Sequence, residues 1–199
     1  GDGLVHGIDY CYRVTAFFYD DAESIASNEY CAYLKRDVPI ITNVSNDSTN
    51  LESGRCLIIW SKPIELDTIE YPGPYKYLLY RNDGLVWSNG GQFISSFNGL
   101  NDTIYLDSEI NLNTHDKPYS YRVEIENETV KPIGSSQKAS SIFLNLQPSD
   151  KEIKLIWAPV VPWENEMTVI YRKDLGSSTY DSIGVSEFGF YRDKRSEER

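Results

Sequence analysis

The chain has 199 residues and a formal net charge of -11, with 30 acidic against 19 basic residues. A balance of this sign argues against nucleic acid and against an anionic membrane surface, since both call for basic faces. No apolar run approaches the roughly 20 residues that a membrane-spanning helix requires. Tyrosine, threonine, isoleucine and valine dominate the hydrophobic segments, and these residues favour strands. The composition therefore predicts an all-β protein.

The first strand signal runs from Ile8 to Phe18. Tyr10, Tyr12 and Val14 alternate there with polar residues, which is the period of a strand with one buried face. From Leu4 onward the spacing is leucine, two residues, glycine, two residues, tyrosine. This spacing is typical of the tyrosine corner of an immunoglobulin-like sandwich, in which the phenol reaches back to the upstream backbone.

Two of the three cysteines are expected to face each other. A turn at Asp20-Asp21-Ala22 connects the first strand to a second from Ala26 to Leu34, and positions symmetric about residue 21 are then opposite. Cys11 and Cys31 form such a pair, near enough for a disulfide in an oxidising compartment, although two facing free thiols are the alternative. Cys56 alternates in phase with the apolar residues of a later strand and is expected to be a buried thiol.

Seven strand signals follow between residues 37 and 141, as expected for one immunoglobulin-like sandwich. They lie around Ile41 and Val44, then at Arg55–Trp60, Tyr75–Arg81, Phe93–Phe97, Thr103–Asp107, from Tyr119, and at Ser135–Ser141. The cycle restarts at residue 142 and yields five more strands. The chain thus divides into the last two strands (F and G) of one domain at 1–36, a complete domain at 37–141, and strands A to E of a third at 142–199.

Several positions repeat along the chain: Trp60 and Trp157 at the end of the second strand, Tyr80-Arg81 and Tyr171-Arg172 on the third, and the corner tyrosines Tyr10 and Tyr119. With these repeated positions the chain resembles fibronectin type III domains. Residues 113–118 depart from the leucine–glycine spacing before Tyr119, which puts the geometry of that corner in question. The resemblance implies tandem β-sandwiches, one complete and two partial.

The two partial units together hold one full set of strands. Truncation of a longer array at both ends is the direct explanation. The alternative is that the tail of one molecule completes its sandwich with the head of another, which is a heterologous, head-to-tail association.

A narrower likeness concerns Tyr10–Val14, Ser27–Cys31 and Trp60-x-x-Pro63-x-x-Leu66-Asp67. These segments are similar to repeat regions of large surface proteins of gliding bacteria, which the type IX system exports. The resemblance implies an extracellular, cell-surface or secreted bacterial protein that is associated with gliding motility. It also implies O-glycans on Asp-Ser/Thr-apolar triplets, with Thr68, Thr103 and Ser182 as acceptors.

The sequence predicts no catalytic, cofactor or metal site. His6 and His115 lie in loops without a nearby nucleophile, and no Cys/His spacing suits zinc. Asp20, Asp21 and Glu23 are expected to be solvated hairpin-tip charges, with calcium binding as the weaker alternative.

The favoured function is therefore a non-enzymatic spacer or adhesion module whose protein or glycan partner is unknown. The alternative is a carbohydrate-binding accessory module of a secreted enzyme. In that case Trp87 and Trp163 would stack on sugar rings. The competing interpretation of Trp163 is that it folds back over the end of the core.

Overall fold

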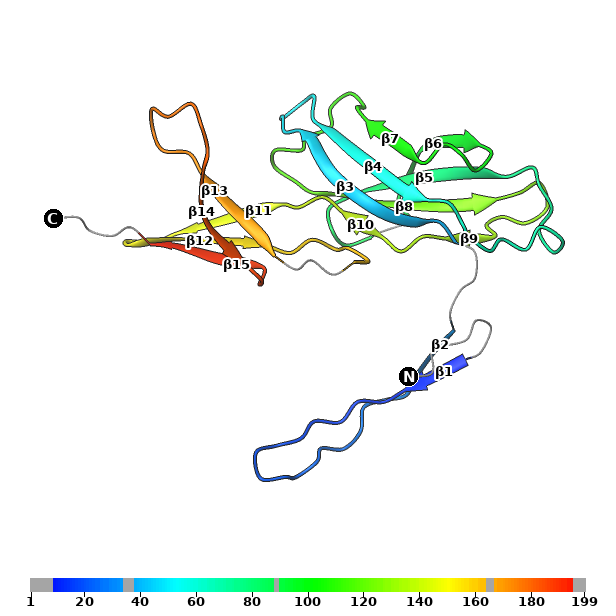
Figure 1. Ribbon diagram of the computed structural model, residues 1–199, viewed down its shortest axis with the longest axis horizontal. Coiled ribbons are helices and arrows are strands. Elements are labelled where there is room, and N and C mark those ends of the chain that lie inside the picture. The colour runs from blue at the N-terminus through cyan, green and yellow to red at the C-terminus, as the bar shows by residue number, and fades with distance from the viewer. Residues whose placement is uncertain (1–8, 34–37, 88–89, 164–166, 195–199) are drawn as a thin grey trace.

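The computed structural model describes residues 9–33, 38–87, 90–163 and 167–194 (Figure 1). All regular secondary structure in these ranges is β-strand or turn. Within them, no helix has the length and hydropathy to cross a bilayer. The predicted fold class, tandem immunoglobulin-like sandwiches with one complete and two partial, is confirmed by the sheets described below.

The central unit consists of two facing sheets. The first has the order β3-β4-β7, and the second the order β10-β8-β5-β6, with β9 also pairing to β8. The strands are β3 (Ile40–Ser48), β4 (Arg55–Ser61), β5 (Lys76–Asp83), β6 (Gln92–Asn98), β7 (Ile104–Asp107), β8 (Tyr119–Glu126), β9 (Gly134–Ser135) and β10 (Ala139–Ser140). The three-stranded sheet faces the larger one, and together they form the immunoglobulin-like sandwich that the sequence predicted for residues 37–141.

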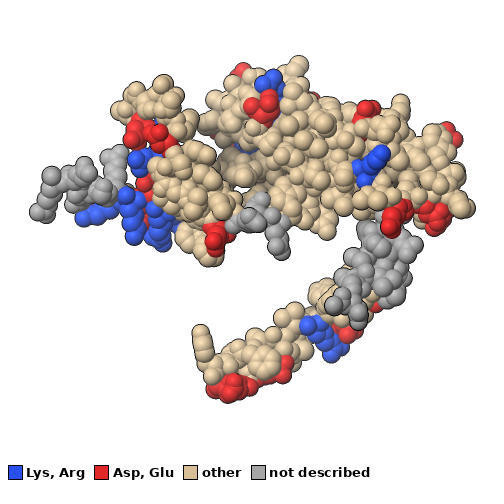
Figure 2. Space-filling view, in the orientation of Figure 1, with Lys and Arg blue, Asp and Glu red and all other residues tan. Residues whose placement is uncertain are grey.

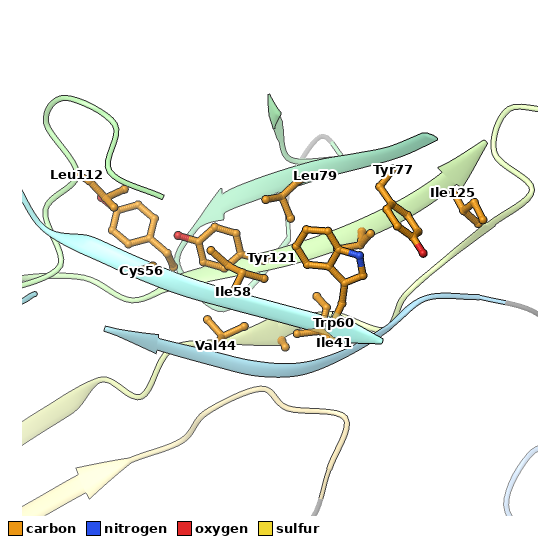
Figure 3. Packing of buried hydrophobic residues seen from close by; sticks show 13 residues of the cluster. Ile41, Val44, Cys56, Ile58, Trp60, Tyr77, Leu79, Leu112, Tyr121 and Ile125 are labelled. Atoms are coloured by element: carbon orange, nitrogen blue, oxygen red, sulfur yellow. The ribbon is translucent and has the colours of Figure 1, made fainter. Parts of the chain in front are cut away.

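Strand alternation places one side of each central strand in a common core (Figure 3). Cys56, Ile58 and Trp60 of β4 are 0–2% exposed, and Tyr77 and Leu79 face them from β5. Trp60 and Tyr77 meet edge to face with ring centroids 5.7 Å apart, an arrangement that aromatic quadrupoles favour. The predicted buried thiol at Cys56 is confirmed.

The last strand of the central unit is interrupted, whereas the sequence predicted one strand from Ser135 to Ser141. It consists of β9 and β10, separated by Ser136–Lys138. The Ser136 hydroxyl accepts the N–H of Val123 at 2.9 Å, so a side chain stands in for part of the backbone ladder.

The hairpin unit is β1 (Asp9–Tyr12) and β2 (Tyr30–Tyr33), in the predicted register with Cys11 opposite Cys31. The predicted strands at 8–18 and 26–34 are too long. Beyond Tyr12 the regular ladder gives way to an isolated bridge between Phe17 and Glu23 and to separate backbone hydrogen bonds, such as that from the Ser27 N–H to the Val14 carbonyl at 2.9 Å. Serine hydroxyls accept backbone N–H groups at Val14 and Ala16, and a two-stranded ribbon without a core supports only a short ladder.

The C-terminal unit has two separate small sheets. They are formed by β11 (Leu144–Pro148), β12 (Glu152–Trp157) and β15 (Phe190–Lys194) in the order β11-β12-β15, and by β13 (Thr168–Arg172) paired with β14 (Asp181–Ser186). Among its described residues only Trp157 and Ile170 are buried hydrophobics. Its core is therefore much smaller than that of the central unit.

Candidate functional site

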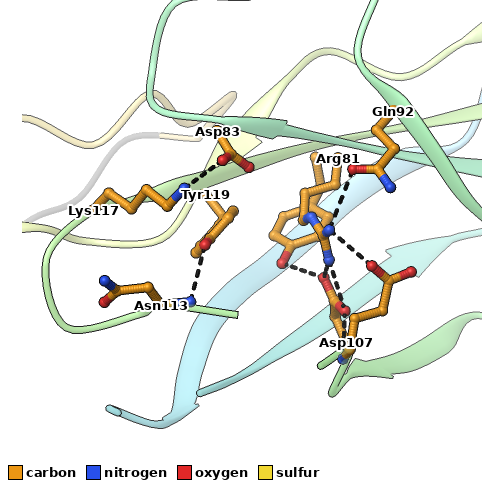
Figure 4. Close-up of polar contacts among 9 residues, drawn as sticks. Arg81, Asp83, Gln92, Asp107, Asn113, Lys117 and Tyr119 are labelled. Carbon is orange, nitrogen blue, oxygen red and sulfur yellow. Dashed lines mark hydrogen bonds and ion pairs between the residues drawn. The ribbon is translucent and has the colours of Figure 1, made fainter. Parts of the chain in front are cut away.

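A buried polar cluster links the two sheets of the central unit (Figure 4). Arg81 of β5 donates to both carboxylate oxygens of Asp107 on β7, at 3.1 and 2.8 Å. The Tyr121 hydroxyl of β8 donates to Asp107 at 2.9 Å, and Arg81 also reaches Glu109 at 2.8 Å. The side chains of Arg81 and Asp107 are only 8% and 0% exposed. Three strands thus supply a charge pair and the phenol that covers it.

The protonation states in this cluster follow from burial and pairing. Burial disfavours the charged guanidinium, but the hydrogen bond and charge of Asp107 outweigh it and raise the pKa of Arg81. Burial raises the pKa of Tyr121 well above its usual range, so the phenol remains a neutral donor. Burial also raises the pKa of the Cys56 thiol beside them to about 11. Both charges are paired within the core, although the buried Arg81 Nε has no hydrogen-bond partner among the described residues. The cluster is therefore a structural ion pair that offers no reactive group.

The corner tyrosine of the central unit keeps its role despite the altered spacing. The Tyr119 hydroxyl accepts the backbone N–H of Asn113 at 3.0 Å (Figure 4). Leu112 is buried, and the Thr114 hydroxyl donates to the carbonyl of Ser48 at 2.8 Å. The chain between β7 and β8 is therefore tied down over the end of the core, and Lys117 pairs with Asp83 beside it.

The C-terminal unit contains the same charge pair without the covering phenol. Arg172 of β13 donates to both oxygens of Asp193 on β15, at 3.0 and 3.1 Å. Their side chains are 43% and 16% exposed. A pocket of about 730 Å³ opens beside them, lined by Asp174, Leu175 and the turn at 148–153. In the central unit the counterparts Arg81, Asp83 and Asp107 each lie beside Tyr119 or Tyr121, and the turn at 48–54 contacts the segment at 112–114.

The sequence did not predict either ion pair. The signal was present, because Tyr105-Leu106-Asp107 and Tyr191-Arg192-Asp193 occupy the same position of the repeat. Each aspartate forms its ion pair with an arginine on the facing sheet, and the two residues come within reach of each other only when both sheets have folded.

The hairpin unit contains the predicted disulfide between Cys11 and Cys31. Glu29 lies near both sulfurs, but the bond between them leaves no thiolate to bind a metal. Leu4, His6 and Gly7 lie outside the described residues, so only Tyr10 of the predicted first corner is described. The fold and the disulfide are compatible with an extracellular protein.

The two tryptophans considered for glycan stacking are both in contact with protein groups. Trp87 is half-buried, and its ring lies 5.0 Å from the Arg122 guanidinium and 5.3 Å from the Lys138 ammonium. Trp163 of the C-terminal unit packs against the core cluster of the central unit. Trp60 and Trp157 hold matching buried positions at the ends of β4 and β12.

The remaining candidate residues are distributed over the surface. Thr68 and Ser182 are exposed and Thr103 is half-buried, and O-glycosylation at these positions stays a prediction. Asp20, Asp21 and Glu23 are exposed at the end of the hairpin unit (Figure 2). The His115 ring contacts only its neighbour Asp116, at 2.7 Å, among the interactions described for it.

No protein-family model matches this chain, and no curated protein matches it. Among solved structures, it is similar to the crystal structure of the chicken CNTN1 FN1-FN3 domains, with 13% identity and a TM-score of 0.31. The match covers 96% of this chain and 67% of that chain. A superposition this loose carries no inference, and the sandwich assignment rests on the strand order and register described above.

Proposed function

We propose that this chain is a non-enzymatic extracellular spacer or adhesion module that holds other parts of a larger assembly apart. The observation that carries the proposal is the direct junction between the central and C-terminal units. Only three residues, 141–143, separate β10 from β11. A connection this short limits how far one unit can turn relative to the next.

Two kinds of contact stiffen this junction. The Ser140 N–H donates to the Val160 carbonyl at 2.7 Å, and the Val160 N–H donates to the Ser140 hydroxyl at 2.8 Å. Trp163 adds an apolar contact by packing on the core cluster of the central unit. Hydrogen bonds in both directions together with a partly buried tryptophan favour one relative orientation of the units.

The sequence likeness to surface proteins of gliding bacteria supports placing the module on a bacterial surface, with type IX export and gliding motility as its setting. The disulfide supports an oxidising compartment. The carbohydrate-binding alternative gains no support from the geometry, since Trp87 lies against two cations and Trp163 lies in the junction.

The proposal is tested by measuring the rigidity of the junction. Dyes attached at exposed positions 102 and 178 report the distance between the two units by single-molecule energy transfer, at concentrations too low for association. We expect a narrow distribution for the parent chain and a broad one for the Ser140→Ala, Trp163→Ala double variant. Trp87→Ala is the matched control and should leave the distribution narrow. A parent distribution as broad as that of the double variant would overturn the stiff-spacer proposal.

A further inference from the structure

We infer that the free edge of β13 binds strand β1 of a second copy of this chain, so that the molecules associate head to tail. This inference goes beyond the spacer role and does not depend on it. Within the residues that the structure describes, β13 pairs only with β14, and β1 pairs only with β2. Each strand therefore has one edge of unpaired backbone groups, which is a ready template for strand addition.

The central unit supplies the template for this pairing. There β5 pairs with β8 in the register Arg81↔Tyr121 and Tyr80↔Arg122. Tyr121 is fully buried by this arrangement and bonds Asp107, while the Arg122 guanidinium lies 5.1 Å from the Tyr80 ring. One strand thus completes the ion pair on one face and forms a cation–π contact on the other.

The open edge in the C-terminal unit has the matching side chains. Tyr171-Arg172 of β13 corresponds to Tyr80-Arg81 of β5, and Asp193 corresponds to Asp107. The ion pair there is partly exposed. The 730 Å³ pocket beside it is lined by Arg172, Asp174 and Asp193, whose counterparts in the central unit contact Tyr119 or Tyr121. A strand that fits this edge must therefore carry a tyrosine directed at Asp193 and an arginine facing Tyr171.

Strand β1 together with the two residues that follow it has this sequence. Tyr10-Cys11-Tyr12-Arg13-Val14 matches Tyr119-Ser120-Tyr121-Arg122-Val123 at four of five positions. The partner strands match as well, because Cys11 pairs with Cys31 where Ser120 pairs with Ser140. The disulfide therefore fixes β1 and β2 as a preformed pair of the last two sandwich strands. Tyr12, 52% exposed in the hairpin, would occupy the position of Tyr121.

A second copy, rather than the same chain, is the occupant that the geometry favours. The hairpin unit joins the central unit near Val38, which lies against Gly134, whereas the C-terminal unit joins at Ser140, at the opposite end of β8. An eight-residue strand such as β8 spans about 26 Å, while the five steps from Tyr33 to Val38 reach about 18 Å at full extension. Figure 1 shows β1 and β13 well apart. Pairing between copies is heterologous and can continue from molecule to molecule.

Disulfide trapping tests the pairing and its register. By the central template Arg13 lies opposite Tyr171, so an Arg13→Cys chain mixed with a Tyr171→Cys chain should cross-link under mild oxidation, and mass spectrometry should identify the 13–171 disulfide. The matched control replaces Tyr171→Cys with Val169→Cys, which is also exposed and two residues away on the same strand. We expect several-fold more cross-linking at 171 than at 169. Equal or greater cross-linking at 169 would overturn the inference.

Sedimentation of the unmodified chain provides an independent readout that needs no new cysteine. The mean sedimentation coefficient should rise between micromolar and millimolar concentrations. Tyr12→Ala should abolish the rise, and Tyr19→Ala, at the exposed hairpin tip, should preserve it. A single monomeric species throughout, or association that Tyr12→Ala leaves unchanged, would contradict the inference.

Discussion

The central and C-terminal units use the same ion pair in opposite environments. Arg81 and Asp107 are nearly inaccessible to solvent, whereas Arg172 and Asp193 are partly open to it. Both pairs bridge the two sheets of their unit with two hydrogen bonds. The difference is strand β8 with its corner segment, which covers the first pair and has no described counterpart over the second. The ion pair of the central unit is therefore buried because β8 covers it, and not because of any property of the arginine and aspartate themselves.

The largest expected effect comes from removing one carboxylate of each pair. Asp107→Ala leaves the buried Arg81 guanidinium with only the partly exposed Glu109 as a charged partner, and breaking a buried pair typically costs about 3–5 kcal/mol of unfolding free energy. Asp193→Ala is the matched variant, and it should leave stability unchanged because solvent reaches Arg172. Urea unfolding of both variants measures the contrast. Equal losses at the two positions would show that burial does not distinguish the units.

Alkaline pH should destabilise the central unit through Cys56. The pKa of this thiol is raised from 9.0 to about 11 in the folded state. The unfolded chain releases the proton first, so the stabilising contribution is complete below pH 9 and is lost as pH rises to about 11. A difference of two pKa units between the folded and unfolded states corresponds to about 2.7 kcal/mol of unfolding free energy.

Urea unfolding at pH 8 and pH 11 measures this loss. Burial also raises the pKa of Tyr77, to about 12, and this adds to the loss at the upper limit. Cys56→Ala is the control, and it should reduce the alkaline decline. An unchanged decline in that variant would assign the effect to the tyrosines alone.

A smaller effect is expected at the corner of the central unit. Tyr119→Phe removes the acceptor of the Asn113 N–H and should reduce stability by about 1 kcal/mol, the usual contribution of one hydrogen bond. Thermal unfolding followed by circular dichroism measures the change. Full stability in the variant would mean that the packing of Leu112 and Thr114 holds this segment without the phenol.

The features predicted correctly from sequence are those that depend on local alternation or on the repeat. The buried faces around Cys56 and Trp60 follow from period-two spacing, and the Cys11–Cys31 register follows from symmetry about one turn. The hairpin length was wrong because pattern alone does not reveal that no core covers residues 13–18. A strand pattern forms a long ladder only where a second layer packs on it.

The polar cluster and the hydrogen bonds across the junction were not predicted, because both join residues that are distant in sequence. Arg81, Asp107 and Tyr121 come from three strands and meet only once both sheets are in register. The bonds between Ser140 and Val160 require the relative placement of two units. Neither spacing nor composition contains that information, although the repeated tyrosine, arginine and aspartate positions indicate where to look.

The most direct test asks whether the lack of a second neighbouring strand on β13 explains why the Arg172–Asp193 ion pair is partly exposed. The measurement is hydrogen exchange of β5 and β13, followed by mass spectrometry at increasing protein concentration. At low concentration the amides of 76–83 should exchange far more slowly than those of 168–172. As concentration rises, 168–172 and 9–12 should gain protection together while 76–83 stays constant. Slow exchange in 168–172 at the lowest concentration, equal to that of 76–83, would contradict the account.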